Sequence, residues 1–386
     1  MGFLRWFLIQ PMSPFLPILI YIAAYFTAYI LSKKFGAIAR EGRYETIDGL
    51  RGFLAIGVFI HHAAIWQQFA TNHVWQSPKS NVYNQIGLYS VMLFFMITSF
   101  LFTSKLLNAE YAPFDWRKFF FARFKRLAPM YYFSLILLLI IVAIQSDFTI
   151  KTSPEELMKS MAHWALFALH DSPDINQLPQ TSIINAGVIW SLSYEWLFYF
   201  SLPLFAFLLS PAKSQFPWLL LSIGFISIFY WAQGFMPYPL LAFAFGVIPA
   251  FLKKYRAYSP QINQNFANIL IIGLLALLCT SYHPYSITNM MILAAIFFTI
   301  TLGSDVFGFL KNPIFQFLGD ISYSTYLLHG ILLYAFFNLV LGIGFTAKLS
   351  SMEYSMYIVF LTPLLVLISY LCFRYIESPF LKKQSR

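Results

Sequence analysis

The chain has 386 residues, of which 59% are hydrophobic and only 10% are charged, a composition that excludes an ordinary soluble domain. Lys and Arg outnumber Asp and Glu by 25 to 15, and the 2 cysteines lie in apolar runs, where neither a disulfide framework nor a thiolate metal site is expected. The composition therefore predicts an all-α integral membrane protein.

Apolar stretches long enough to cross a bilayer recur along the chain. Because a spanning helix needs about 20 mostly apolar residues, we expect a polytopic bundle of about 11 transmembrane helices. The segment 157–170 is too short and too polar to span, so we expect a re-entrant or interfacial helix there. The expected spans are 15–32, 50–69, 85–104, 127–145, 189–209, 216–234, 238–252, 266–282, 287–303, 321–343 and 355–373.

Basic residues cluster in alternate connections between these spans. Since cytoplasmic loops carry an excess of Lys and Arg, the alternation predicts an outer N-terminus and a cytoplasmic C-terminus. We expect three parts: an additional N-terminal span with a basic loop (1–44), a membrane domain (45–380) and a basic tail (381–386). The basic residues of the connections and tail expected on the cytoplasmic side are Lys33, Lys34, Arg40, Arg43, Lys105, Arg117, Lys118, Arg123, Lys125, Arg126, Lys253, Lys254, Arg256, Arg374, Lys382, Lys383 and Arg386.

The stretch 47–62 places a charged start before an apolar run that ends in two histidines. Arg51 and His62 are eleven residues apart, so on a helix they share one face and lie about 16 Å apart. Ionisable groups at membrane depth are usually functional, which predicts Arg51 as an anion anchor and a neutral His62 as a buried general base. His61 points about 100° away from that face. The alternative is an Arg that follows the positive-inside rule and histidines bonded to neighbouring helices.

A basic, aromatic stretch at 114–133 precedes the fourth span. Arg123 and Arg126 are three residues apart and meet on one helical face, where two guanidinium groups favour phosphate binding. Pro129 predicts a break in the helix just as the span 127–145 begins. The alternative is an ordinary basic loop on anionic lipid headgroups.

The stretch 190–200, WSLSYEWLFYF, carries a carboxylate inside an apolar span. Under the expected topology, Glu195 lies about one and a half turns below Trp190 on the outer side. Intramembrane carboxylates are more often functional than structural, and Trp190 and Ser193 beside this acid are candidates for binding a sugar-like acceptor. A structural ion pair is the alternative.

The stretch 319–330, GDISYSTYLLHG, predicts a polar stripe on an apolar helix. Tyr326 and His329 fall on the face of Ser322, and Tyr323 follows Ser322 directly. Such a stripe must face the bundle interior or a wet cavity. A hydrogen-bonded structural His329 is the alternative to a functional one.

Together, these stretches resemble the integral-membrane acyltransferase type 3 family, whose members mostly acylate bacterial surface glycans. The resemblance covers about residues 44–380. The matches are Arg51 and His62 in a DGLRG context; Phe94, Phe95, Phe100 and Leu101 of FFxxSGFL; Arg123, Arg126, Pro129 and Tyr131 of RxxRxxPxY; Trp190, Ser191, Leu192, Ser193, Glu195 and Trp196 of WSLSxEW; Ser322, Tyr323, Tyr326, Leu327 and His329 of SYxxYLxH; and Glu377, Ser378 and Pro379 of the closing ExP.

The sequence departs from that family in four respects. Thr98 and Ser99 replace the usual Ser-Gly, so the close helix contact that glycine allows is not expected there. Tyr194 stands where a small aliphatic residue is usual, and the span 15–32 precedes the family core. The chain also ends after the membrane part, so we expect the stand-alone form, without the extracytoplasmic hydrolase-like domain of some relatives.

The resemblance implies an acyl-CoA donor, most often acetyl-CoA, and a glycan hydroxyl acceptor on the outer side, often lipid-linked. The CoA phosphates are expected on Arg51, Arg123 and Arg126, with the pantetheine arm running toward His62. His62 is then the expected general base, although an acyl-enzyme relay through His62 remains open.

The same resemblance implies roles for the remaining polar residues. Glu195 is expected to orient the acceptor. His329, together with Ser322 and Tyr323, is expected to support His62 or to polarise the thioester carbonyl. No metal is expected, because the other histidines lack metal-ligand spacing.

Two other functions fit parts of the pattern. A glycan or lipid transporter would use the polar stripe as a pathway and would bind no CoA. A glycosyltransferase that uses a lipid-linked sugar would need acidic, metal-binding loops, yet the outer loops hold only sparse acids such as Asp171 and Asp174. The clustered Arg residues favour the acyltransferase.

Overall fold

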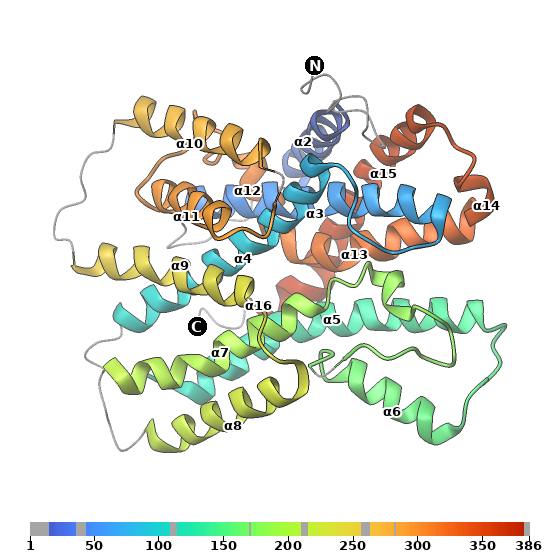
Figure 1. The fold of residues 1–386 in the computed structure, drawn as a ribbon, viewed down its shortest axis with the longest axis horizontal. Helices are drawn as coiled ribbons and strands as arrows, with labels where there is room; N and C mark the ends of the chain where they lie inside the picture. The colour runs from blue at the N-terminus through green and yellow to red at the C-terminus, as the bar shows by residue number, and fades with distance from the viewer. Residues whose placement is uncertain are drawn as a thin grey trace. The chain divides into compact units, whose positions relative to one another are not determined.

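Every regular element in the described part of the chain is a helix. The structure is a computed structural model, and no strand occurs among the residues that it describes (Figure 1). The all-α class predicted from composition is confirmed for these residues. They are 15–35, 44–108, 114–169, 171–209, 215–255, 263–281 and 283–381.

The chain divides into two compact units, and each is described by itself. The first unit comprises Met1–Phe94, Ile183–Ala186 and Gln261–Tyr375. The second comprises Phe95–Ser182, Gly187–Pro260 and Ile376–Arg386. Helix α4 (Asn81–Asn108) therefore contributes residues to both units.

Helix α3 (Glu45–Asn72) is the centre of the first unit, and it carries both Arg51 and His62. Helices α2, α12 and α13 pack directly against it. The other helices of this unit and their bounds are α2 (Leu16–Phe35), α10 (Gln264–Cys279), α11 (Ile287–Thr301), α12 (Pro313–Asp320), α13 (Ser322–Tyr334), its π-helical continuation η3 (Ala335–Val340), α14 (Ile343–Thr346) and α15 (Ser351–Cys372).

Glycines allow α12 to approach α3 closely. A Cβ atom added at Gly52 would meet the backbone of Phe315, and one added at Gly319 would meet the backbone carbonyl of Asp48. Neither contact can be relieved by rotating a side chain, because backbone atoms lie on the other side. The glycines of the DGLRG stretch are therefore packing residues that fix the helix carrying Arg51.

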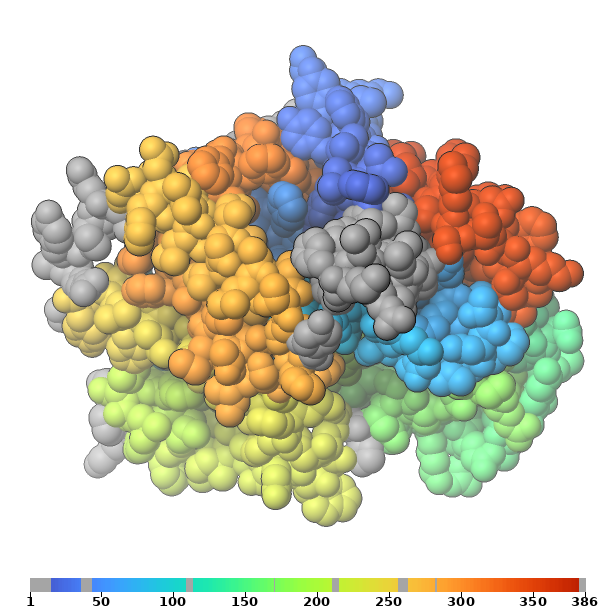
Figure 2. Space-filling model, turned by 45° about the horizontal axis from the view of Figure 1, so that its top comes forward, coloured from blue at the N-terminus to red at the C-terminus, as the bar shows by residue number. Residues whose placement is uncertain are grey.

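Helix α2 coincides with the first predicted span and covers part of α3. The Tyr21 hydroxyl donates to the Phe53 carbonyl at 3.1 Å, and the two rings lie 4.5 Å apart between centroids. Figure 2 shows α2, in blue, standing out from the helices around it. Its outward side chains are apolar and exposed, as lipid contact requires. They are Ile18, Leu19, Ile22, Phe26 and Ile30.

The second unit contains the other helices, apart from the short η1 (Thr181–Asn185) and η4 (Phe373–Glu377), which each have residues in both units. Its long helices are α5, α7, α8 and α9, and α6 is a shorter helix. Their bounds, with those of the short helix that closes the described chain, are α5 (Trp116–Gln145), α6 (Pro154–Ala165), α7 (Trp190–Leu209), α8 (Phe216–Gln233), α9 (Pro237–Tyr255) and α16 (Ser378–Leu381).

Helix α5 begins earlier than expected and runs through Pro129, so the predicted break at this proline is wrong. Asp115 caps its first turn by accepting a hydrogen bond from the Lys118 amide at 3.0 Å. Prolines are tolerated inside membrane helices where neighbouring groups satisfy the freed carbonyl. Because α5 is continuous, Arg123 and Arg126 lie on one helical face, as their spacing predicts.

Helix α6 (Pro154–Ala165) begins three residues before the segment 157–170, which was expected to be re-entrant or interfacial, and covers its first nine residues. The Ser153 hydroxyl caps it by accepting from the Glu156 amide at 3.2 Å. The Thr152 hydroxyl donates to the Glu156 carboxylate and thereby holds the pKa of Glu156 below its usual value. In the last turn of the helix, the buried Trp164 indole donates to the carbonyl of Pro173, which follows the helix, at 2.9 Å. A helix in this segment is confirmed, whereas its depth in a membrane stays a prediction.

Helices α4 and α9 of the second unit are in close contact, although Ser99 of α4 replaces the glycine of the family motif. A Cβ atom added at Gly246 of α9 would meet the Ser99 hydroxyl and the Met96 backbone on α4. The small residue is thus supplied by the opposite helix.

Each of the eleven predicted stretches coincides with a helix. Among the described residues, 8 helices are long and apolar enough to cross a membrane, while α10 and α11 are shorter, with 16 and 15 residues. The protein is therefore a multi-pass membrane protein, and the number of about 11 spans stays a prediction. The predicted basic residues Arg40, Arg43, Arg256, Lys382, Lys383 and Arg386 lie outside the described residues.

Candidate active site

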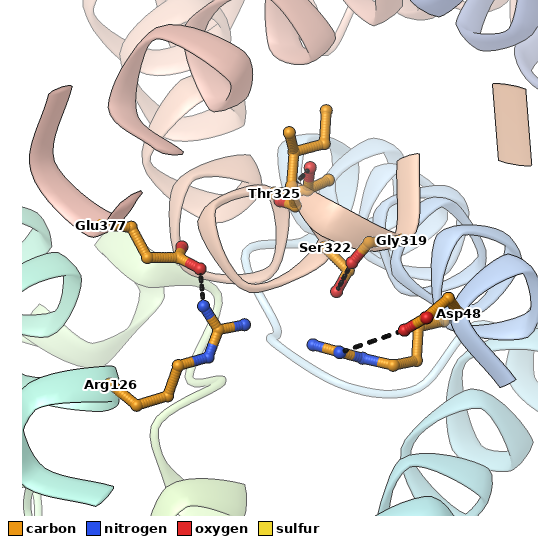
Figure 3. A network of polar contacts seen from close by, with 8 residues as sticks. Asp48, Arg126, Gly319, Ser322, Thr325 and Glu377 are labelled. Carbon is orange, nitrogen blue, oxygen red and sulfur yellow. Dashed lines mark hydrogen bonds and ion pairs between the residues drawn. The ribbon is translucent and has the colours of Figure 1, made fainter. Parts of the chain in front are cut away.

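Arg51 lies in the second turn of α3, near the start of the helix. Its guanidinium pairs with Asp48 across 3.9 Å and keeps 22% of its side-chain surface exposed (Figure 3). A pair this long and this accessible is weak. Arg51 therefore remains available to a stronger anion, and the glycine contacts with α12 hold its backbone in place.

His62 and His329 form a direct pair in the first unit. The Nδ1 atom of His62 lies 3.0 Å from the Nε2 atom of His329, and it also lies 3.0 Å from the Val58 carbonyl. The Nδ1 atom of His329 lies 3.1 Å from the Thr325 carbonyl. His329 is completely buried, whereas His62 keeps some accessible surface.

These partners fix the tautomer of both rings. A carbonyl only accepts hydrogen bonds, so the Nδ1 atoms of His62 and His329 must each carry a proton. With both rings neutral, the Nε2 atom of His329 is unprotonated and accepts from the Nδ1–H group of His62. The Nε2 atom of His62 then carries a lone pair, and it has no hydrogen-bond partner among the described residues. This arrangement is that of a neutral base aimed away from its supporting histidine.

His61 serves a different contact, as its position on α3 predicts. Its Nδ1–H group donates to the Tyr83 carbonyl at 2.8 Å. The ring packs against Gly87, where an added Cβ atom would collide with it. His61 therefore anchors α3 to α4.

The polar stripe predicted on α13 is buried, as expected. Ser322, Tyr323, Tyr326 and His329 are all at most 9% exposed. The Ser322 hydroxyl donates to the Gly319 carbonyl at 2.7 Å, as Figure 3 shows. That hydrogen bond joins residues only three positions apart. Of these four residues, His329 is the one that forms a hydrogen bond with His62 in the described part of the chain.

In the second unit, Arg123 packs against aromatic side chains. Its guanidinium carbon lies 4.7 Å from the centre of the Phe102 ring, and the Tyr199 hydroxyl lies near the group. Its Nε atom is buried and has no hydrogen-bond partner. A half-buried guanidinium with one unsatisfied N–H group is expected to bind an anion.

Arg126 forms an ion pair with Glu377, also in the second unit (Figure 3). The Glu377 side chain is 1% exposed and that of Arg126 is 13% exposed, so both charges are largely removed from water. The glutamate of the closing ExP motif thus neutralises an arginine of the basic motif. A phosphate group at Arg126 would have to share it with this carboxylate.

Glu195, Trp190 and Ser193 all lie on α7 in the second unit. The Glu195 carboxylate accepts a hydrogen bond from the Tyr199 hydroxyl one turn later. The Ser193 hydroxyl donates to the Trp190 carbonyl at 2.7 Å, whereas the Trp190 side chain is 37% exposed. Ser193 is therefore engaged by its own helix, and Tyr199 links Glu195 to Arg123.

Three participants were not identified from the sequence. Tyr199 lies four residues after Glu195, a spacing that predicts helical contact. Glu377 was matched to a motif, but sequence spacing does not reveal a partner 251 residues away. Trp75 stacks near His62 with an interplanar angle of 14° from a segment without regular structure, where no sequence signal predicts its position.

Comparison with known proteins identifies the family of this chain. A family model described as an acyltransferase domain matches residues 44–374. The O-acetyltransferase OatA of Staphylococcus aureus strain NCTC 8325 is 28% identical over 376 residues. A protein of strain COL, whose O-acetyltransferase name is itself provisional, is 25% identical over 388 residues. Each comparison covers 87% of this chain, and the chain spans 57% of the length of these relatives.

No solved structure matches the chain. The family model nevertheless covers Arg51, His62, Arg123, Arg126, Glu195 and His329. The chain therefore belongs to the acyltransferase 3 family.

Proposed function

We propose that this protein is a membrane O-acyltransferase of a bacterial cytoplasmic membrane. It moves an acyl group, proposed to be acetyl, from cytoplasmic acyl-CoA to a hydroxyl of an extracytoplasmic glycan, either free or lipid-linked. Family membership and the O-acetyltransferase names of the relatives support acyl transfer. The observation that carries the proposal is the His62–His329 pair, because it leaves one imidazole nitrogen free to accept a proton.

The donor is proposed to bind along α3. Arg51 would hold a CoA phosphate, because a guanidinium forms charge-assisted, bidentate bonds with phosphate that its long pair with Asp48 does not match. Eleven residues along the same helix, about 16 Å, separate this anchor from His62. The pantetheine arm would run along that face toward the imidazole.

The proposed chemical step uses one base, His62. The acceptor oxygen attacks the thioester carbonyl carbon while the His62 Nε2 atom takes the hydroxyl proton. The positive charge that develops on His62 is stabilised through Nδ1–H by the Val58 carbonyl and the His329 Nε2 atom. The C–S bond then breaks, and the CoA thiolate takes the proton from His62. The products are an acyl ester and CoA.

In the second unit, Arg123 and Arg126 remain proposed phosphate ligands, and Glu195 remains a proposed acceptor-orienting group. The unsatisfied Nε atom of Arg123 supports the first role. The Glu377 pair makes Arg126 the weaker of the two ligands. The cytoplasmic C-terminus remains part of the proposal and follows from the distribution of basic residues.

Mass spectrometry of surface glycans tests the function. Cells that express the protein should carry an acyl group that is absent without the gene and absent with His62→Ala. Identical glycans in all three strains would contradict the proposal.

The main alternative is a glycan or lipid transporter. Purified protein in liposomes would then move an unmodified substrate without CoA and would bind no CoA. We expect instead that acetyl-CoA raises the melting temperature of the purified protein in a concentration-dependent manner.

A further inference from the structure

We infer that the outer end of α3 forms the acceptor subsite, in which Trp75 and the indole N–H group of Trp66 bind a sugar ring against His62. This inference rests on the proposed function and names the residues that would hold its acceptor. All three side chains belong to the first unit.

The first observation is the order of groups along α3. Trp66 follows His62 by one helical turn, whereas Arg51 precedes His62 by about three turns. If Arg51 holds the donor, the donor approaches His62 from the start of the helix. The residues beyond His62 are then on the side from which an acceptor hydroxyl would reach the same imidazole.

The second observation is an unsatisfied polar atom. Trp66 is completely buried, and its Nε1 atom has no hydrogen-bond partner. A buried donor without a partner destabilises the fold, and native proteins rarely keep one without a reason. Its ring is held by edge-to-face contacts with Phe69, Trp75 and Tyr334 at centroid distances of 5.4, 5.6 and 5.6 Å. The ring is therefore fixed, and its buried N–H group is the polar atom that a ligand oxygen bound beside Trp75 would satisfy.

The third observation is the placement of Trp75. Helix α3 ends at Asn72. Its C-cap residue His73 adopts a left-handed conformation with φ 57° and donates its N–H group to the Phe69 carbonyl at 2.8 Å. This turn brings the chain back over the helix, so that the Trp75 ring faces His62 at a centroid distance of 6.4 Å. Trp75 is only partly buried, unlike Trp66.

These features suit a hydroxylated ring better than a lipid chain. The face of an indole packs against the apolar face of a sugar, while an N–H donor and an imidazole nitrogen bind its hydroxyls. A lipid chain would leave both polar atoms unsatisfied. Of the predicted acceptor groups on α7, the Ser193 hydroxyl is engaged by its own helix.

The test uses the full-length protein in proteoliposomes with acetyl-CoA and a panel of 4-nitrophenyl glycosides, with glycerol as a hydroxyl donor that lacks a ring. Trp66→Phe removes the N–H group and keeps an aromatic ring, and Trp75→Ala removes the partly exposed ring. Trp231→Phe is the matched control, because this tryptophan is 83% exposed on α8.

We expect each site variant to raise KM for the glycosides about 3- to 10-fold, the value of one hydrogen bond or ring contact. KM for acetyl-CoA and activity toward glycerol should change less than about twofold, and Trp231→Phe should match the wild type. Melting temperatures report folding. If Trp66→Phe does not fold, Trp75→Ala carries the test alone.

An unchanged KM for glycosides in a folded variant would overturn the inference, and so would a rise confined to acetyl-CoA. If the wild type cleaves acetyl-CoA but acetylates no glycoside, the inference fails while the proposed function stands. If the wild type neither cleaves acetyl-CoA nor transfers acetyl, the proposed function itself fails.

Discussion

His329 is expected to act through His62, and replacing it separates a positioning role from a chemical one. The His62 Nδ1–H group has two acceptors, each at 3.0 Å: the His329 Nε2 atom and the Val58 carbonyl. His329→Leu removes the first acceptor and leaves the second. Leucine also suits the completely buried position of His329.

The size of the effect follows from that geometry. One net hydrogen bond contributes about 0.5–1.5 kcal/mol. Each 1.36 kcal/mol is a factor of about ten in rate, so His329→Leu should lower kcat roughly 2- to 13-fold. Loss of the base itself, in His62→Ala, should lower kcat about 100- to 10,000-fold.

The assay measures CoA thiol release coupled to ester formation by purified protein in proteoliposomes. His329→Gln is the conservative control, because its amide oxygen can accept from the His62 Nδ1–H group. We expect it to recover activity to within about threefold of the wild type. If His329→Leu falls as far as His62→Ala and glutamine does not recover activity, His329 takes part in the chemistry directly and the positioning argument is wrong.

Three further predictions concern the supporting structure. Glu377→Gln should lower the free energy of unfolding by about 3–5 kcal/mol, because it removes the buried carboxylate that neutralises the Arg126 guanidinium. Chemical denaturation in detergent measures this, and a loss below about 1 kcal/mol would contradict a buried pair. Gly319→Ala should destabilise the protein by about 1–3 kcal/mol, because the added methyl group clashes with α3. The control Gly273→Ala, with no atom within 4 Å of the added methyl group, should be neutral or stabilising. Thermal unfolding measures both, and equal effects would refute close packing at Gly319. Arg51→Gln should raise the Kd for acetyl-CoA about 10-fold or more in a binding titration, and an unchanged Kd would remove Arg51 from the donor site.

The sequence was most informative where one helix carries the signal. The spacing of Arg51 and His62 correctly put them on a single helix, and the polar stripe of 322–329 was correctly expected to be buried. Both inferences depend only on local helical periodicity, which the backbone geometry dictates. The glycines of the DGLRG stretch were noticed as a motif, but their role in the α12 contact needed the partner helix.

Contacts between distant segments were not predictable. The pairing of His329 with His62 crosses 267 residues and that of Glu377 with Arg126 crosses 251, and neither distance is encoded in local patterns. The position of Trp75 depends on the reversal of the chain at His73. The residue type at this position does not by itself predict a left-handed backbone. The predicted break at Pro129 was wrong because membrane helices accommodate proline, which interrupts helices in soluble proteins.

The central claim is that His62 is the base that activates the acceptor hydroxyl. The most direct test compares acetyl transfer by wild-type, His62→Ala and His61→Gln proteins in proteoliposomes at saturating acetyl-CoA. We predict that kcat falls about 100- to 10,000-fold in His62→Ala, with the Kd for acetyl-CoA retained, and that His61→Gln stays within about threefold of the wild type. Transfer by a folded His62→Ala protein at the wild-type rate would contradict the account.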